Sequence, residues 1–276
     1  MVQRRGATAF LRGAGSGSRG WGFNARVVPD CDTTSVVTSA LSPQRVLVQD
    51  DLEFVLRHAV PGQGFATYSD AESLRKYRGS STEADFGGWM LSHECVTAQV
   101  LALLERAQDS ARVSQVRTSA RTWLVNRQTD SGLWRAYWWD SELYVAARIV
   151  PILRLSESPT DRAAAARATA AIHGLSSVDG WWGRHEQPCL LSTCWALAAL
   201  DATSNDDSAR AVRWLLSKQE SDGRWTSTPC LRIPQPDCRS PAHARFEMGG
   251  RGVGSIGAGE YSVYSTATVL GFLSRL

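Results

Sequence analysis

The sequence contains the stretch WLVNRQTDSGLW at residues 123–134 and repeats its pattern as WLLSKQESDGRW at residues 214–225. Each stretch has a Trp-Leu pair, a Gln four residues after the Leu, and a Gly two residues before a second Trp. A weaker copy runs through residues 172–182, and residues 87–89 (Gly-Gly-Trp) keep only its last part. The final Trp residues of these copies are 45, 48 and 43 residues apart, a period that predicts stacked helix pairs.

The segments after these turns contain mostly small and apolar residues, in the ranges 95–104, 192–200 and 265–273. A helix that is apolar on nearly all sides is buried, whereas the helices before the turns carry Arg and Lys on one face and must be half exposed. Alternating buried and exposed helices close most simply into a double ring. The sequence therefore predicts an all-α fold, an α/α barrel with inner and outer helices.

Composition excludes several classes of protein. With 276 residues, 43% of them hydrophobic, the chain can bury a core without covalent staples. No apolar run approaches the roughly 18 residues of a membrane span, so we expect no transmembrane segment. The net charge is +3, but residues 1–26 hold five Arg and no acid, which leaves 3 − 5 = −2 on the remainder. A folded part without a basic stripe argues against nucleic acid as a partner.

The first 20 residues are rich in Arg and Gly and lack the apolar centre of a signal peptide. We interpret residues 1–20 as a flexible Arg-rich arm and residues 21–276 as a single barrel domain. A transit peptide and an anion-steering role for the arginines are the alternatives.

The six cysteines form no C-x-x-C pair and match no zinc-site spacing. We expect free thiols in a reducing compartment, with a Cys230–Cys238 bridge as the alternative, and a cytoplasmic location.

The repeated Trp-Leu-x3-Gln-x3-Gly-x-Trp pattern resembles the QW motif of squalene-hopene cyclases and related class II terpene cyclases. The resemblance covers about residues 21–276 and implies the α/α-barrel fold of that family. It also implies that the motif tryptophans tie the end of an outer helix to the neighbouring inner helix. Trp123, Trp134, Trp214 and Trp225 are therefore expected to hold the fold together rather than to line an active site.

Two carboxylates lie at the start of another helix of the inner type. The segment Pro-Asp-Cys-Asp-Thr-Thr at residues 29–34 places Thr34 in register with Thr97, Thr193 and Thr266 when the ends of the four helices are aligned. Because the N-termini of inner helices converge at one end of a barrel, the polar residues at this level should surround a single cavity opening. They are Asp30, Asp32, His93, Cys95, Asp140, Glu142 and Tyr264.

This segment resembles the D-x-D-D acid motif of the family, most like the bacterial class II diterpene cyclases. The resemblance implies that Asp32 is the general acid that protonates a terminal alkene or epoxide, with Asp30 as its neighbour. Two close carboxyls hold one proton between them, since the pair resists a double negative charge. Thr33 stands where the family has a further Asp, which keeps hydrogen bonding but removes a charge.

A second departure concerns the histidine that orients and reprotonates the acid in hopene cyclases. This chain has Cys95 where they have Asp and Gln99 where they have that histidine. His93 is the candidate substitute, and a purely structural role for it is the alternative.

Carbocations in a dry pocket are stabilised by the faces of aromatic rings, Trp above all. Trp138 and Trp139, beside Asp140, are the best candidates for such a wall. The predicted substrate-binding residues are Trp138, Trp139, Trp21, Asp140 and Tyr264, with packing as the alternative role for the tryptophans.

We therefore predict acid-initiated cyclisation of an isoprenoid, either a prenyl diphosphate or a related polyprene. The acid step needs no cofactor, and Mg²⁺ would accompany only a diphosphate substrate, since no resident metal site is evident. Class II cyclases enclose their substrate between two helical domains, so a second chain or a homodimer could close the cavity. The Pro- and Gly-rich residues 229–260 are expected to form a lid, or else a disordered insertion.

Three other readings stay open. A protein prenyltransferase-like subunit would need a zinc site drawn from Asp32, His93 and Cys95. A non-catalytic isoprenoid-binding or partner subunit could use the same barrel. The Asp-x-Asp-x-Thr spacing also matches a phosphatase nucleophile motif, but the buried strand which that motif requires is absent from the sequence pattern. Substrate length, product skeleton and oligomeric state are not encoded in any recognisable motif.

Overall fold

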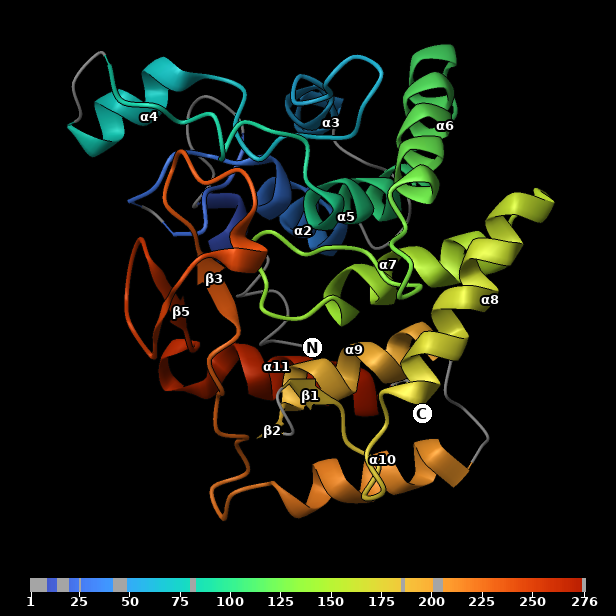
Figure 1. Ribbon diagram of the computed structural model, residues 1–276. Helices are drawn as coiled ribbons and strands as arrows, with labels where there is room; N and C mark the ends of the chain where they lie inside the picture. The colour runs from blue at the N-terminus through green and yellow to red at the C-terminus, as the bar shows by residue number, and fades with distance from the viewer. Residues whose placement is uncertain are drawn as a thin grey trace. The chain divides into compact units, whose positions relative to one another are not determined.

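The computed structural model describes residues 9–13, 20–24, 26–41, 49–79, 83–184, 187–200 and 206–274. The chain forms two compact units, the first comprising Met1–Asn126 with Pro236–Arg239 and the second Arg127–Gln235 with Ser240–Leu276 (Figure 1). The prediction of one domain over residues 21–276 stays a prediction. Of the arginines assigned to the arm, Arg4, Arg5 and Arg19 lie outside the described residues.

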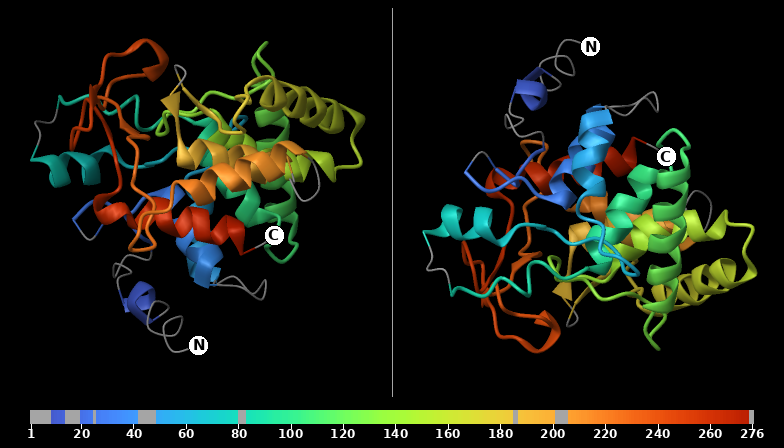
Figure 2. Two further views of the ribbon diagram at one scale, coloured as in Figure 1. Left: turned by 90° about the horizontal axis from the view of Figure 1, so that it is seen from below. Right: turned by 90° about the horizontal axis from the view of Figure 1, so that it is seen from above.

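In the described part of the first unit the regular elements are helices, and isolated β-bridges join Ala59 to Phe65 and Ala66 to Ser92. Helix α2 packs beside α5, with α3 against α2 and α6 against α5 (Figure 2). Besides the helical residues 9–13, the described helices of this unit are α2 (Cys31–Leu41), α3 (Gln49–Leu56), α4 (Ala71–Arg78), α5 (Glu94–Leu104) and α6 (Ala111–Asn126).

In the second unit, α7 and α9 pack closely, α8 lies against both, and α10 and α11 pack on α9 (Figure 1). Its helices are α7 (Leu143–Arg154), α8 (Pro159–Gly174), α9 (Leu190–Leu200), α10 (Asp206–Ser217) and α11 (Val263–Leu273). Two short 3-10 helices are η1 (Pro241–His243) and η2 (Glu260–Ser262). The strands are β1 (Gly183–Arg184), β2 (Gln187–Pro188), β3 (Leu231–Ile233), β4 (Glu247–Met248) and β5 (Ser255–Gly257).

The predicted alternation of buried and exposed helices is confirmed for most of the chain. Nearly every residue of α5 and α9 is buried, whereas α6 buries only Val113, Ala120 and Leu124. Helix α11 differs from the prediction, because it buries only Ser265, Val269 and Phe272. Its small and apolar composition was expected to bury it on most sides, yet Leu270 is 51% exposed. Sequence composition reports what a helix can bury, not whether a neighbour covers it.

Residues 229–260 are folded, so the alternative of a disordered insertion is wrong for this segment. Strand β3 pairs antiparallel with β5, and β5 pairs parallel with β4. At Pro236–Arg239 the segment joins the first unit, where the backbone N–H of Trp89 donates to the Pro236 carbonyl at 3.1 Å. Its role as a lid stays a prediction.

A threonine and an aromatic residue form the same contact in four places. The hydroxyl of Thr193 accepts a hydrogen bond from the backbone N–H of Trp182 at 3.0 Å, and Thr266 does the same for Trp225 at 3.0 Å. Thr34 accepts from Trp21 at 2.9 Å and Thr97 from Phe65 at 2.8 Å. The register predicted for these four threonines is confirmed by this shared bond.

The tryptophans after the turns also fasten the preceding outer helices. The indole N–H of Trp182 donates to the Ile172 carbonyl at 2.7 Å, and that of Trp225 donates to Leu215 at 2.7 Å. Both indoles are fully buried. The glutamine of the motif closes the turn itself, since Gln128 donates to Gly132 at 2.7 Å and to Ala164 in α8 at 2.8 Å. The structural role expected for the repeated motif is therefore confirmed for Trp225, and it stays a prediction for Trp123, Trp134 and Trp214.

Phe65, and not Trp89, is the aromatic of the copy that precedes α5. Val60 and Gln63 form the hydrogen-bonded turn before it, as Thr129 and Gly132 do in the full motif. Trp89 instead packs on Tyr68 and Phe86. The Gly-Gly-Trp at residues 87–89 is thus not a decayed copy, because a phenylalanine occupies the aromatic position of this repeat.

The six cysteines, all within the described residues, are free, so the alternative of a Cys230–Cys238 bridge is not formed. Among the described helices, none combines the length and apolar character that crossing a bilayer would require.

Candidate active site

The acid motif begins helix α2. Asp30 precedes the helix and caps it, because its Oδ1 accepts a hydrogen bond from the backbone N–H of Thr33 at 2.7 Å and its carbonyl accepts from Thr34 at 3.1 Å. Only 4% of Asp30 is exposed. The sequence folds this way locally because an aspartate is among the best residues to satisfy the unpaired N–H groups of a first helical turn.

Asp30 has the electrostatic character of a carboxyl that retains its proton. Burial raises the pKa of Asp30 to about 7, and the charge of Asp32 adds to this effect, against the hydrogen bonds from Thr33. Two carboxyls that raise each other's cost of ionisation behave as a pair which holds one proton near neutral pH.

Asp32 and Thr33 lie in the first turn of α2 and are both half-buried. Asp32 is thus less enclosed than Asp30, although its Oδ1 atom is shielded from solvent. The backbone N–H of Thr33 donates to the Asp30 carboxylate, so Thr33 helps to hold the carboxyl pair in place.

The loop at residues 65–68 forms the next wall of the acid site. The backbone N–H of Cys31 donates to the Thr67 carbonyl at 3.0 Å, which anchors the loop to the start of α2. Tyr68 follows, and burial, helped by the charges of Asp30 and Asp32, raises the pKa of its phenol. Tyr68 is a candidate functional residue that no motif or spacing in the sequence indicated.

His93 is buried and holds this loop. Its Nδ1 lies 3.3 Å from the Thr67 hydroxyl, and its Nε2 lies 3.0 Å from the Gly88 carbonyl. Since a carbonyl can only accept, Nε2 carries the proton and Nδ1 accepts from Thr67. Burial lowers the pKa of His93 to about 3, so the imidazole is neutral at physiological pH. His93, the candidate substitute for the histidine that reprotonates the acid, is therefore neutral and has no imidazolium proton to donate.

Trp139 is at the centre of an aromatic cluster in the second unit. Its ring stacks on Tyr144 at 4.6 Å and on Tyr264 at 5.6 Å between centroids, and it meets Trp195 edge-on at 5.2 Å. Trp139 is 9% exposed, whereas Tyr264 is 40% exposed. Trp138 is half-buried and packs edge-on against Tyr137 at 5.0 Å. The cluster offers aromatic faces of the kind that stabilise a cation.

Asp140, predicted to contact the substrate, is paired with two guanidiniums of the protein. Its Oδ1 accepts from Arg232 at 2.5 Å and also pairs with Arg184. Arg232 is 6% exposed and donates to the Ala136 carbonyl at 2.8 Å as well. Asp140 thus neutralises a buried guanidinium, and any anionic group of a ligand would meet Arg184 here rather than the carboxylate. Arg232 lies in the folded segment 229–260 and carried no recognisable sequence signal.

Trp21, whose predicted role as a substrate contact stays a prediction, makes a structural hydrogen bond. Its indole N–H donates to the Leu11 carbonyl at 2.8 Å, ten residues earlier, as Trp182 and Trp225 do in their copies. Residues 9–13 are helical, so this part of the predicted arm belongs to a first copy of the repeat. Trp21 is therefore one of the tryptophans that hold the fold together.

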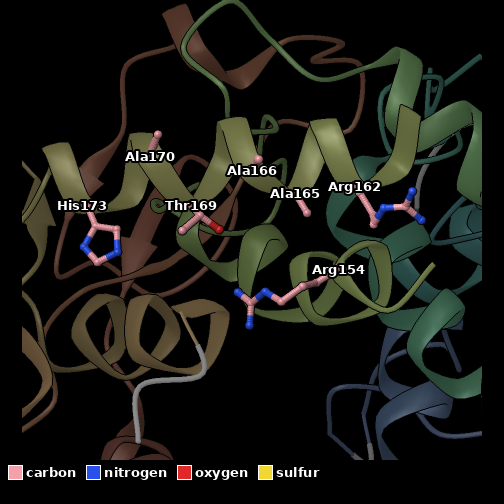
Figure 3. Close-up of a pocket in the computed structure, with 7 residues that line it drawn as sticks. All are labelled: Arg154, Arg162, Ala165, Ala166, Thr169, Ala170 and His173. Atoms are coloured by element: carbon pink, nitrogen blue, oxygen red, sulfur yellow. The ribbon is translucent and has the colours of Figure 1, made fainter. Parts of the chain in front are cut away.

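A separate hollow of about 400 Å³ lies in the second unit along α8. Arg154, Arg162 and His173 surround a floor of small α8 residues (Figure 3). Both guanidiniums already donate to backbone carbonyls, Arg154 to Ala199 and Arg162 to Ser156 and Glu157. None of the predicted site residues lines this hollow.

Comparison with known proteins agrees with the predicted fold and family. The family model of the squalene-hopene cyclase C-terminal domain matches residues 11–230. The chain belongs to this family, within the class II terpene cyclase superfamily.

Among solved structures, the type II terpene cyclase MstE from Scytonema is similar to this chain, with a TM-score of 0.84 and 27% identity over 99% of this chain and 80% of that chain. That structure, of an Asp-to-Ala variant, holds merosterolic acid A as product. An Asp-to-Asn variant of the same enzyme holds geranylgeranyl dihydroxybenzoate as substrate. The similarity confirms the predicted α/α-barrel fold class.

Among curated proteins, the squalene-hopene cyclase of Zymomonas mobilis is 24% identical over 75% of this chain and 35% of its own length. The lanosterol synthase erg7A of Aspergillus fumigatus is 23% identical over 64% of this chain and 27% of its own length. This chain therefore spans about a third of the length of these curated relatives.

Proposed function

We propose that the chain catalyses a class II terpene cyclisation in which Asp32 protonates an isoprenoid. The observation that carries the proposal is the Asp30 and Asp32 pair at the start of α2, where Asp30 is buried and its pKa is raised to about 7. A catalyst that protonates carbon needs a carboxylic acid that is still protonated at working pH, and a carboxyl pair of this kind supplies one.

The two carboxyls have different parts in the proposal. Asp30 is committed to the helix, since its Oδ1 accepts the N–H of Thr33. Asp32 is the less buried member and is the proposed donor. The single proton of the pair, which burial favours on Asp30, must therefore move to an Asp32 oxygen before it reaches the terminal alkene carbon or the epoxide oxygen of the substrate. Because Asp30 and Asp32 share one proton, the pair carries a single negative charge. The backbone N–H of Thr33 holds the Asp30 carboxyl in place. His93 and Thr67 position the loop beside them.

The carbocation formed by protonation needs a dry, electron-rich surrounding until the rings have closed. The aromatic cluster of the second unit, in which Trp139 is backed by Tyr144 and Trp195 and flanked by the more exposed Tyr264, is the proposed contact for the isoprenoid chain. Trp138 is the second candidate of the wall.

The substrate is an isoprenoid small molecule, in keeping with the prenylated substrate bound to MstE. The acid step requires no cofactor. A Mg²⁺ ion that accompanies a diphosphate substrate remains a prediction; among the described residues no group of three or more His, Cys, Asp or Glu is arranged to bind a metal. A second helical domain or a homodimer that closes the cavity, and a cytoplasmic location, remain predictions.

The test is incubation of the purified chain with geranyl, farnesyl and geranylgeranyl diphosphates, squalene and geranylgeranyl dihydroxybenzoate, followed by product analysis. Asp32→Asn should lower the rate of cyclisation by about 10³-fold, in the range of a lost general acid. Asp206→Asn is the matched control, because Asp206 is an exposed carboxylate in the first turn of α10. It should leave the rate unchanged.

Cyclic products formed at the same rate by Asp32→Asn would show that another group is the acid. Absence of product from every substrate, with the wild-type chain folded, would favour the isoprenoid-binding or partner subunit. A prenyltransferase-like role has weaker support, since Asp32, His93 and Cys95 are not gathered as metal ligands in the described part of the chain.

A further inference from the structure

Residues 236–239, which belong to the first unit, form a strap that lies against Gly88. The backbone N–H of Trp89 donates to the Pro236 carbonyl at 3.1 Å. A Cβ at Gly88 would overlap the carbonyl oxygen of Cys238 and would come within 2.7 Å of that of Pro236. Because both obstacles are backbone atoms, only a residue without a side chain lets the strap approach this closely.

The carbonyl of the same glycine binds a buried histidine. The Nε2–H of His93 donates to the Gly88 carbonyl at 3.0 Å, and its Nδ1 accepts from the Thr67 hydroxyl at 3.3 Å. His93 and Thr67 are each 4% exposed, so a lost partner is not readily replaced by water. The side chain of Thr67 is therefore held in place relative to Gly88.

Thr67 in turn binds the backbone between the two carboxyls of the acid motif. Its carbonyl accepts the N–H of Cys31 at 3.0 Å, and Cys31 lies between Asp30 and Asp32. An N–H in the first turn of a helix has no partner within the helix. Thr67 supplies the acceptor, so the peptide that joins Asp30 to Cys31 keeps one orientation.

Backbone contacts hold the same loop from its other end. The N–H of His93 donates to the Phe65 carbonyl at 3.1 Å, and Ala66 forms an antiparallel bridge with Ser92. The loop that carries Thr67 is thus joined to His93 through both the backbone and the imidazole. A displacement of His93 would therefore displace Thr67 as well.

We propose that the strap positions the acid pair through Gly88, His93 and Thr67, so that efficient proton transfer requires the strap to be seated on Gly88. These three act through other groups rather than on the substrate, so each is a positioning residue. The effect of the strap on proton transfer rests on the proposed function of Asp32, whereas its hold on the start of α2 does not. A lid would act on substrate entry, but the strap acts on the acid.

The first experiment measures amide hydrogen exchange in the full chain by NMR, for the wild type and for Gly88→Ala. The added methyl group displaces the strap, so the amides of Trp89 and Cys31 should exchange at least about tenfold faster. The amide of Val100, in the buried middle of α5, reports unfolding of the unit as a whole. It should keep its wild-type rate, which separates loss of the strap from a general loss of stability.

Gly87→Ala is the matched control, at the neighbouring position. A Cβ at Gly87 would meet the end of the Arg239 side chain and that of Asp85, each at 2.9 Å, and such ends can move aside. This variant should leave the Trp89 and Cys31 amides at their wild-type rates.

Two variants of the histidine test the middle of the pathway. His93→Ala should speed exchange at Cys31, whereas His93→Gln, which can still donate to Gly88, should retain most of the protection. This pair decides the question even where Gly88→Ala does not fold. A wild-type exchange rate at Cys31 in Gly88→Ala or His93→Ala, or an equal acceleration at Val100, would overturn the proposal.

The second experiment measures steady-state kinetics on a substrate that the wild type cyclises. Gly88→Ala should lower kcat by about 10²-fold and change KM by less than about twofold, as expected when an acid is misplaced but substrate binding is intact. A raised KM with unchanged kcat would show that the strap acts on substrate entry, contrary to the proposal. A wild type without activity would count against the proposed function of Asp32, and the exchange rates would still decide whether the strap holds the start of α2.

Discussion

Helices α2 and α9 begin with the same set of backbone hydrogen bonds but carry different side chains, an aspartate and a cysteine, at the capping position. In α2 the N–H of Asp30 donates to the Trp21 carbonyl at 3.0 Å, and in α9 the N–H of Cys189 donates to Trp182 at 3.1 Å. Four residues further on, Thr34 and Thr193 bind the backbone N–H of the same two tryptophans. These shared hydrogen bonds, which we call the backbone frame, are a property of the repeat and do not depend on the capping side chain.

The capping side chains use this frame in opposite ways. Thr33 donates its N–H to the Asp30 carboxylate at 2.7 Å, and Ser192 donates to the Cys189 sulfur at 3.5 Å. Burial nevertheless raises the pKa of Asp30 to about 7, whereas hydrogen bonds lower the pKa of Cys189 to about 5. The difference shows that burial and a neighbouring carboxylate can outweigh the same helix terminus that stabilises a thiolate.

The largest expected difference between the two helix starts concerns their tryptophans. Trp182 is fully buried and Trp21 is half-buried, although both indoles bond the carbonyl ten residues earlier. Trp182→Ala should lower the free energy of unfolding by about 3 to 5 kcal/mol, as large core truncations do. Trp21→Ala should cost roughly half as much or less. Urea unfolding of both variants measures these losses. An equal loss would show that Trp21 and Trp182 contribute equally to the free energy of unfolding.

The next prediction concerns the dependence of stability on pH. An acid whose pKa is raised on folding stabilises the protein below its unfolded pKa and loses that contribution as pH rises through the folded value. Asp30 should therefore lower the stability of the wild type by about 3 kcal/mol between pH 4 and 7. Asp30→Asn, which keeps the capping acceptor, should remove this loss from urea unfolding measured across the range.

Cys189 should give the opposite slope. Its pKa is lowered from 9.0 to about 5, so its contribution to stability is present above pH 9 and is lost as pH falls toward 5. Cys189→Ser should remove that gain while leaving the Asp30 slope in place. If both variants changed the pH profile in the same direction, the contrast between the two helix starts would be wrong.

The smallest expected effect tests the shared frame. Thr34 and Thr193 are both fully buried, and each accepts the N–H of its tryptophan. Thr34→Val and Thr193→Val should each cost about 1 to 2 kcal/mol, since an N–H that is kept from water loses its acceptor. Thermal or urea unfolding should give equal losses within error, and a loss at only one site would mean that the frames are not equivalent.

Much of the fold follows from spacing in the sequence. The Trp-Gln-Gly-Trp pattern predicts the helix pairs, and aligning the helix ends predicts that Thr34, Thr97, Thr193 and Thr266 share a position. The copy at residues 54–65 escaped detection because Phe54 and Phe65 replace the two tryptophans at the same spacing and the glutamine is missing. The physical requirement there is a large ring after a turn, and an indole is only one way to meet it.

The candidate site was predictable in part. The Asp-x-Asp spacing at a helix start identifies Asp30 and Asp32, because capping and acidity depend on nearby residues. The protonation state of His93 depends on Thr67 and Gly88, which are close in space rather than in the motif. Arg232 reaches Asp140 across 92 positions of sequence, and no local pattern can indicate such a pair.

The sequence alone determined the repeat, the helical class, the family and the acid motif, since these rest on periodicity and on contacts within one or two turns. Tertiary structure decided which carboxyl of the pair is buried, that the Trp21 indole bonds Leu11, that Asp140 is neutralised, and that Thr228 lies against the Cys189 sulfur. These features depend on which distant groups exclude water from a side chain or donate to it. Such contacts are set by packing between elements, which the residues of a single motif do not specify.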